Sequence, residues 1–417
     1  MERIVVRGGT RLNGTVRVSG SKNSTLPIMA ACLLTSKECI LHQVPDIDDI
    51  RVMEEVLVKL GAGVKREGDT LIIDGGSVDS WELPESLTRK MRASNLVMGA
   101  LISRFRSARV AYPGGCAIGS RPMDLHIKGF KELGCEVDDS RGYIEARASR
   151  LQGREILLDF PSVGATENIM MAAVKAEGVT IIRNAAREPE IVDLQNFLNR
   201  MGARIRGAGL ATIRIEGVSS LGGVTHDVIP DRIEAGTFMV ASAISQGDVV
   251  AENVVAGHME PIIAKLKEVG AKIMKCNGGI RVIGKRPVRP VDLKTLPFPG
   301  FPTDMQPQMM ALLATAEGTS VIVETVFENR FMHVDELRRM GADIKVEGRV
   351  AIIRGKPKLA GAAVEATDLR AGAALILAGL YAEGETIIGN TDHIDRGYES
   401  IEDKLRSLGA TISRVDG

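Results

Sequence analysis

Residues 112–126 read YPGGCAIGSRPMDLH and bring a thiol, a guanidinium, a carboxylate and an imidazole together within one short stretch of chain. Cys116 follows two glycines, whose backbone freedom favours a loop over a packed core. A cysteine in such a loop is better suited to meeting a ligand than to filling space. We therefore predict that Cys116 takes part in chemistry.

The other cysteines have a different interpretation. They are Cys32, Cys39, Cys135 and Cys276. The total of five is odd and includes no CxxC pair, which favours reduced thiols and argues against a zinc site. Because free cysteine is mostly a small buried hydrophobe, we interpret these four as core residues and expect no metal.

Charged and polar residues recur where helices are expected to begin. These positions are Lys22, Asn23, Arg92, residues 162–166, Asp231, Arg232, Asp304 and Arg370, and later loops add Arg121, Arg330 and Arg396. A helix N-terminus attracts anions because its free N–H groups and its dipole both favour negative charge. The pattern predicts a cleft lined by cations that takes a small anionic ligand, with Asp304 as its notable acid.

An internal repeat explains why these positions recur. A hydrophobic residue, a glycine, a small residue and a charged or β-branched pair return at intervals of 68 to 73 residues, with the glycine at Gly61, Gly134, Gly202, Gly270, Gly341 and Gly409. Each glycine stands at the expected C-terminal end of an amphipathic helix. Each unit is predicted to run strand, helix, strand, helix, strand. Six units in 417 residues favour two domains of three units, because single cores stop growing near 250–300 residues.

Composition excludes several classes of protein. The chain has 53 basic and 53 acidic residues and only 3% aromatic residues, so it lacks the basic surface or stacking rings typical of nucleic-acid binding. It begins MERIVVRGGT, without an apolar signal segment, and no run of residues reaches the length of a membrane span. We expect a cytoplasmic, soluble protein with no membrane or nucleic-acid partner.

The same residues carry a family resemblance. From VRGGTRLNGTVRVSGSKNS to HIDRGYESIEDKLRSLGA the chain resembles the UDP-N-acetylglucosamine 1-carboxyvinyltransferase family of enolpyruvyl transferases, and PGGCAIGSRPMDLH is the most specific segment. The resemblance implies an α/β fold of two inside-out domains, each of three repeats. The expected domains are residues 21–229, and residues 1–20 with 230–417. The chain then crosses between them near Gly20 and near Pro230, and the active site lies in the interdomain cleft.

The resemblance further implies a reaction without metal or organic cofactor. The enolpyruvyl group of phosphoenolpyruvate passes to the 3-hydroxyl of UDP-N-acetylglucosamine through a tetrahedral ketal, and phosphate is released. Cys116 matches the proton donor, which also forms a covalent adduct with phosphoenolpyruvate and reacts with the epoxide fosfomycin. Asp304 matches the residue at the sugar hydroxyl. The implied catalytic residues are Cys116, Asp304, Lys22 and Arg396.

Two sets of binding residues follow from the same match. For phosphoenolpyruvate they are Lys22, Asn23, Cys116, Arg121, Arg370 and Arg396. For UDP-N-acetylglucosamine they are Asn23, Arg92, Arg121, Pro122, Met123, Asp124, Leu125, Ser162, Val163, Gly164, Asp304 and Val326. Arginine suits the carboxylate and phosphate of phosphoenolpyruvate because its planar fork makes paired charge-assisted hydrogen bonds.

Some departures and alternatives stay open. Phe160 stands where some relatives have a lysine, and Leu96 where some have a tryptophan, which affects a nucleotide contact but not the reaction. One alternative is the enolpyruvyl transferase that acts on shikimate 3-phosphate, although it lacks the glycine-flanked cysteine loop. Another is a sugar-nucleotide binder without catalysis, which would not need Cys116 or Asp304. We interpret His126 as a structural hydrogen-bonding residue.

Overall fold

The computed structural model describes residues 2–112 and 123–416. The predicted site residues Cys116, Arg121 and Pro122 lie outside the described residues. The chain divides into two compact units. The first unit holds the described residues from Gly20 to Ile229, and the second unit holds those up to Ser19 and from Pro230 onward.

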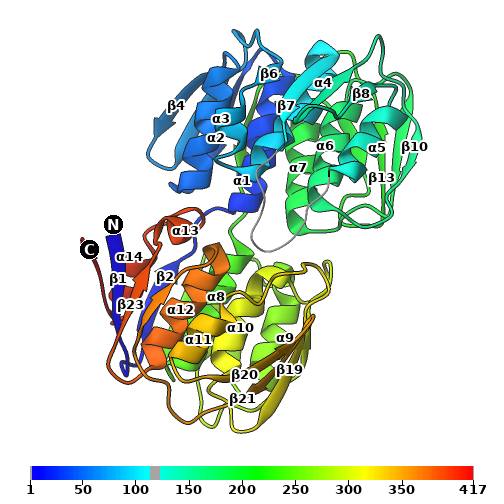
Figure 1. Cartoon of the computed structure of the whole chain (residues 1–417). Helices are drawn as coiled ribbons and strands as arrows, with labels where there is room; N and C mark the ends of the chain where they lie inside the picture. Colours follow the sequence, from blue (N-terminus) through cyan, green and yellow to red (C-terminus); the bar gives the residue numbers. More distant parts are fainter. Residues whose placement is uncertain (1, 113–122, 417) are drawn as a thin grey trace. The chain divides into compact units, whose positions relative to one another are not determined.

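Three four-stranded sheets form the first unit (Figure 1). The first has the order β14 (Val224–Asp227), β3 (Glu38–His42), β5 (Thr70–Asp74), β4 (Gly63–Glu67). The second has the order β6 (Glu82–Leu83), β7 (Ser107–Ala111), β9 (Tyr143–Arg147), β8 (Glu136–Asp138). The third has the order β10 (Glu155–Leu157), β11 (Val179–Arg183), β13 (Thr212–Glu216), β12 (Arg204–Arg206).

The second unit repeats this plan (Figure 1). Its sheets are β16 (Lys272–Cys276), β17 (Gly279–Ile283), β15 (Asp248–Glu252), β2 (Asn13–Arg17); β18 (Leu293–Lys294), β19 (Thr319–Val323), β21 (Val350–Arg354), β20 (Asp343–Glu347); and β22 (Ala363–Glu365), β23 (Glu385–Gly389), β1 (Glu2–Arg7), β24 (Thr411–Asp416). Each sheet has one parallel pair, which lies at one edge. This pair is β2 and β15 in the first sheet of the second unit and the first two strands named in every other sheet, and all other pairs run antiparallel.

Each unit keeps three helices in its interior. They are α1 (Lys22–Ala31), α4 (Val97–Phe105) and α6 (Val163–Ala173) in the first unit, and α8 (Arg232–Ile244), α10 (Gln306–Leu313) and α12 (Leu369–Tyr381) in the second. Nearly all their residues are buried. A helix that is apolar on all sides belongs in a core, so the sequence places these helices inside and the sheets around them, as the inside-out prediction requires.

The second helix of each repeat is amphipathic or short. These helices are α2 (Asp48–Lys59), α5 (Asp124–Glu132), α7 (Pro189–Arg200), α9 (Glu260–Glu268), α11 (Val334–Arg339), and the pair α13 (Asp392–Asp395) and α14 (Ile401–Ser407). The six marker glycines follow them with φ between 90° and 108°. Side chains other than glycine rarely adopt this left-handed conformation, which explains why the marker recurs.

The repeat contains one strand more than its pattern indicated. A hairpin of two strands follows five of the marker glycines, as with β4 and β5 after Gly61. The extra strand β4 reads GVKRE and lies at a sheet edge with no fully buried residue. Charged edge strands carry little hydrophobic signal, so the periodicity does not reveal them.

The chain passes between the two units twice, after β2 and after β14. β2 precedes α1 in the chain but pairs with β15 in the second unit, and β14 precedes α8 but pairs with β3 in the first. At the crossings, the Asp231 amide donates to the Ser19 carbonyl (2.9 Å) and the Ser21 amide donates to the Ile229 carbonyl (2.7 Å). Each hydrogen bond stays within one unit.

Cys32, Cys39 and Cys135 are buried as expected, but Cys276 is exposed. The prediction for Cys276 is wrong because β16 is an edge strand whose last two residues face solvent. In the described part of the chain, none of the helices has the length and apolar character needed to cross a membrane.

Candidate functional site

All six predicted helix starts are helix N-termini. Ser21, Ser162, Asp231 and Asp368 cap α1, α6, α8 and α12 with side-chain oxygens that accept backbone N–H groups. The other two begin as 3₁₀ turns, η2 (Arg92–Leu96) before α4 and η4 (Thr303–Met305) before α10. The prediction that these residues share one structural position is confirmed.

In the first unit, Lys22 begins α1 with its ammonium against an acid. Its Nζ lies 3.1 Å from Oδ2 of Asp49, in the first turn of α2. The side chains are only 11% and 6% exposed. A buried ammonium requires a compensating charge, and here Asp49 contributes one. The Lys22 ammonium is therefore oriented by a neighbouring acid.

A buried network also fixes the first turn of α1. Asp193 of α7 accepts hydrogen bonds from Ser24 Oγ (2.5 Å), His226 Nε2 (2.9 Å) and the Ile229 amide (3.3 Å). Although serine, histidine and aspartate meet here, the carboxylate of Asp193 stands between the hydroxyl and the imidazole, which is not the order serine, histidine, aspartate of a nucleophilic triad. The network is structural and holds the turn that carries Lys22 and Asn23, next to the crossing at Ile229.

Several residues predicted for the sugar nucleotide gather around His126. Its Nδ1 accepts from Asn168 Nδ2 (3.0 Å), because Asn168 Oδ1 already accepts the Gly99 amide (2.7 Å). The neutral ring therefore carries its proton on Nε2. Burial, with Arg92 nearby, lowers the pKa of His126 to about 3. A side chain at Gly164 would come 3.2 Å from the ring. His126 of α5 thus packs against η2 and α6 as a neutral structural residue, as expected.

The rest of this group occupies the starts of the same elements. Met123 precedes α5 and its Sδ accepts from Asn95 Nδ2 of η2 (2.9 Å). Asp124 is exposed, Leu125 is partly buried, and Ser162, Val163 and Gly164 are partly buried at the start of α6. Leu96 is buried in the core and Phe160 is 45% exposed. The Ser162 amide donates to the Phe160 carbonyl (2.7 Å).

In the second unit, Asp304 lies between two buried arginines. Arg330 Nη2 donates to Oδ1 (3.1 Å), and Arg370 donates to Oδ2 from Nη2 (3.1 Å) and Nε (3.3 Å). Both arginine side chains are 2% exposed, whereas Asp304 is 28% exposed. Burial opposes the charge of Arg370, but the nearby Tyr398 and Asp304 raise the pKa of its guanidinium on balance. Asp304 is therefore a partly open carboxylate with both oxygens engaged.

A second acid, Glu324, positions the turn that carries Asp304. Glu324, only 1% exposed, accepts from Thr295 Oγ1 (2.8 Å) and Thr303 Oγ1 (2.9 Å). It also accepts the Val326 amide (2.8 Å) and the Phe327 amide (3.2 Å). The carboxylate thereby joins the turn that carries Asp304 to the loop that carries Val326. Both were predicted to contact the sugar nucleotide.

Arg396 ends the short helix α13 and is partly buried. The next two residues are buried against the helix core, and Tyr398 lies with its ring 5.3 Å from the Arg370 guanidinium carbon. In the second unit, direct contacts join Asp304 to Arg370, and Arg396 stands two residues before Tyr398, whose ring lies beside Arg370. In the first unit, Arg92 and Gly164 lie near His126, whereas Lys22 pairs with Asp49.

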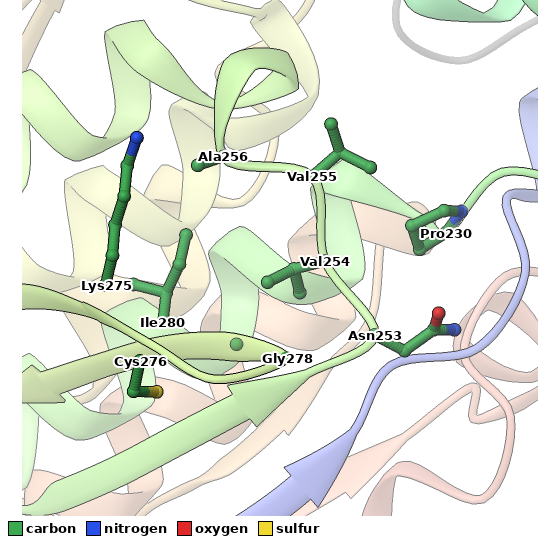
Figure 2. A pocket seen from close by; sticks show the side chains of 10 residues that line it. Pro230, Asn253, Val254, Val255, Ala256, Lys275, Cys276, Gly278 and Ile280 are labelled. Carbon is green, nitrogen blue, oxygen red and sulfur yellow. The ribbon is translucent and has the colours of Figure 1, made fainter.

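A hollow of about 430 Å³ on the second unit is a separate feature. Its lining consists of Pro230, residues 253–256, Lys275, Cys276 and residues 278–280. Figure 2 shows the loop that carries Val254 and Val255 facing the hairpin that carries Lys275 and Cys276. Among the described residues, none of the predicted site residues lines this hollow, so we treat it apart from the candidate site.

Sequence reasoning missed the acids and the tyrosine that orient the predicted cations. Asp49, Asp368 and Tyr398 belong to this group, and Glu324, which holds the turn of Asp304, was missed as well. Asp368 caps α12 and its Oδ1 lies 3.8 Å from Arg330 Nη1. The available signal was weak: Asp49 and Asp368 stand near helix starts, where acids are common in any case. Their partners are distant in sequence.

Comparison with known proteins finds relatives along the whole chain. A protein-family model described as EPSP synthase (3-phosphoshikimate 1-carboxyvinyltransferase) matches residues 6–405. UDP-N-acetylglucosamine 1-carboxyvinyltransferase 1 of Caldanaerobacter subterraneus subsp. tengcongensis is 59% identical over 412 residues, which cover 99% of each chain.

Solved structures of enolpyruvyl transferases are similar to this chain along its whole length. The enolpyruvyl transferase NikO from Streptomyces tendae matches with a TM-score of 0.90 and 28% identity, covering 100% of this chain and 99% of that one. EPSP synthase from Acinetobacter baumannii matches with a TM-score of 0.77 and 20% identity over 100% of both chains, a likeness that shows the fold alone.

Proposed function

This chain belongs to the family of UDP-N-acetylglucosamine 1-carboxyvinyltransferases among the enolpyruvyl transferases, and we propose how its residues perform the reaction. It transfers the enolpyruvyl group of phosphoenolpyruvate to the 3-hydroxyl of UDP-N-acetylglucosamine and releases phosphate. The observation that carries this assignment is 59% identity along 99% of the chain. The EPSP synthase structure shares only 20% identity, so it supports no claim on shikimate 3-phosphate.

The cations bind phosphoenolpyruvate. Lys22 and Arg370 offer positive charge at the starts of the interior helices α1 and α12, and Arg396 offers it at the end of the short helix α13. Charge-assisted hydrogen bonds to carboxylate and phosphate are the strongest of their kind. Lys22 and Arg370 are buried, so water screens them little. We assign Asn23 and Arg121 to the same ligand by their match to the family.

The reaction needs a proton at C3 of phosphoenolpyruvate and loss of a proton from the sugar hydroxyl. Addition forms the C3–H bond and the bond from the hydroxyl oxygen to C2. We assign the acid role to Cys116, which gives its thiol proton to C3 in the addition. Elimination breaks the C2–O bond to phosphate, which leaves with the bonding electrons, and the Cys116 thiolate takes a proton back from C3. Asp304 holds the sugar hydroxyl and takes up its proton. Because both Asp304 oxygens already accept from arginines, the hydroxyl has to share one oxygen with Arg330 or Arg370.

The residues around His126 and the loop that Glu324 holds bind the sugar nucleotide. Helix N-termini at α5 and α6 suit its diphosphate because their N–H groups favour anions. The binding set is Asn23, Arg92, Arg121, Pro122, Met123, Asp124, Leu125, Ser162, Val163, Gly164, Asp304 and Val326. Asn23 and Arg92 of this set belong to the first unit, and Asp304 and Val326 belong to the second.

A phosphate-release assay tests the assignment. Phosphoenolpyruvate is supplied with UDP-N-acetylglucosamine, with shikimate 3-phosphate, or with no acceptor. We expect phosphate only with the sugar nucleotide. Release with shikimate 3-phosphate would favour the other transferase, and tight binding of the nucleotide without any release would favour a non-catalytic binder.

A further inference from the structure

Tyr398 occupies a central place in the second unit that the reaction itself does not explain. It is 2% exposed and follows Arg396 by two positions. Its hydroxyl lies 3.0 Å from Thr237 Oγ1 of α8 and 3.2 Å from Gln308 Nε2 of α10. Its ring lies beside Arg370 of α12. One side chain therefore contacts all three interior helices of this unit.

Counting protons fixes the direction of this network. Thr237 Oγ1 donates its only proton to the Ile233 carbonyl (2.8 Å). It must therefore accept from the Tyr398 hydroxyl. The tyrosine proton is then committed to Thr237, so the Tyr398 oxygen accepts from Gln308 Nε2. Its remaining lone pair points to a donor, and the nearby charged guanidinium of Arg370 is suited to that role.

The backbone around Tyr398 is fixed as well. The Tyr398 and Gly397 amides both donate to the Ile394 carbonyl (3.1 Å each). Gly397 packs so closely that a Cβ there would lie 2.7 Å from Leu369 Cδ2, at the start of α12. The turn that carries Arg396 is thus pressed against the helix start that carries Arg370.

We propose that Tyr398 is a positioning residue that sets Arg370 and Arg396 for the carboxylate and phosphate of phosphoenolpyruvate. The inference rests on the proposed function, because it needs those arginines to bind that substrate. In a buried network whose hydrogen bonds can run in only one direction, each side chain is held in a single orientation. It holds two cations from separate segments in a fixed relation before the ligand arrives.

The test compares Tyr398→Phe with Tyr381→Phe. Tyr381, near the end of α12, also donates a hydroxyl hydrogen bond, to the Pro357 carbonyl (2.6 Å), and also lies against an arginine, Arg286 (4.4 Å). It is not part of the proposed site. Tyr398→Phe should raise KM for phosphoenolpyruvate about fivefold to tenfold, the effect of losing one hydrogen bond. KM for UDP-N-acetylglucosamine should change less than about twofold, and Tyr381→Phe should leave both values unchanged.

Thr237 provides an independent route. Thr237→Val removes the acceptor and should reproduce the change in KM, whereas Thr237→Ser keeps the hydroxyl and should not. The Tyr398→Phe and Thr237→Val double variant should raise KM by less than the product of the two single effects, because both substitutions remove the contact between Tyr398 and Thr237.

The outcomes separate the two proposals. A wild-type protein that releases no phosphate with UDP-N-acetylglucosamine overturns the proposed function. An active wild type whose Tyr398→Phe and Thr237→Val variants change both KM values equally, or neither, overturns the positioning role while the function stands.

Discussion

Replacing Asp49 tests whether the chain holds Lys22 by burying it beside an acid. Asp49→Ala removes the carboxylate 3.1 Å from an ammonium that is 11% exposed. At an effective dielectric constant of about 20, two unit charges at that distance attract by roughly 5 kcal/mol. Loss of one partner of a buried pair costs about 3–5 kcal/mol, since the other charge stays buried. We expect a loss of that size in the free energy of unfolding.

The neighbouring Asp46 supplies a matched control. It pairs with Arg51 at 2.8 Å, but these side chains are 47% and 58% exposed. Exposed pairs contribute about 0–1 kcal/mol because water screens them. Asp46→Ala should therefore cost at most about 1 kcal/mol, although Asp46 and Asp49 stand only three positions apart. Asp49→Asn, which keeps an oxygen acceptor, should fall between the two.

Urea unfolding with and without inorganic phosphate measures both effects. Phosphate that binds the folded state stabilises it by mass action. With Asp49 removed, an anion near Lys22 no longer competes with that carboxylate, so phosphate should restore more stability to Asp49→Ala than it adds to the wild type. Equal losses for Asp46→Ala and Asp49→Ala would refute the reasoning, as would an unchanged response to phosphate.

Three further predictions follow from single side chains. Glu324→Gln replaces a four-fold acceptor and should cost about 1.5–3 kcal/mol in urea unfolding; it should raise KM for UDP-N-acetylglucosamine more than for phosphoenolpyruvate, and the reverse order would contradict the role given to Val326. Because burial, with Arg92 nearby, lowers the pKa of His126 to about 3, while the unfolded residue titrates near ~6.5, the unfolded chain binds more protons in that window. Stability should fall as pH drops from about 6.5 towards 3, and His126→Asn should flatten that slope in pH-dependent denaturation. Fosfomycin should modify Cys116 rather than the exposed Cys276, as peptide mass spectrometry would show, and Cys116→Asp should keep turnover while losing sensitivity.

The sequence predicts those features that repeat along the chain. Six glycines at similar spacing indicated the ends of the second helices, and their positive φ explains why glycine stands at each of these positions. The starts of the first helices followed from the same register. Residues such as Lys22 and Arg370 were found because equivalent positions recur. The extra strand in each hairpin escaped detection because β4 and similar edge strands mix charged and small residues.

The residues that hold the cations in place do not repeat, and so they leave no pattern. Lys22 and Asp49 are 27 positions apart, and Thr237 and Tyr398 are 161 apart. Each contact exists only once the helices are packed, and the same residue types elsewhere in the chain make surface pairs. A single sequence shows which charges lie at helix starts. It does not show which of them are buried, and burial decides their energetic weight.

Burial also distinguishes the two acids that flank the cations of the second unit. Asp304 is 28% exposed and accepts from two arginines, whereas Glu324 is 1% exposed and accepts from hydroxyl and amide groups alone. A carboxylate that is partly open can meet a substrate hydroxyl. One that is enclosed by four donors can only hold the backbone around it. The chain therefore uses the same functional group for contact with the ligand and for support, and the surrounding donors decide which role each acid has.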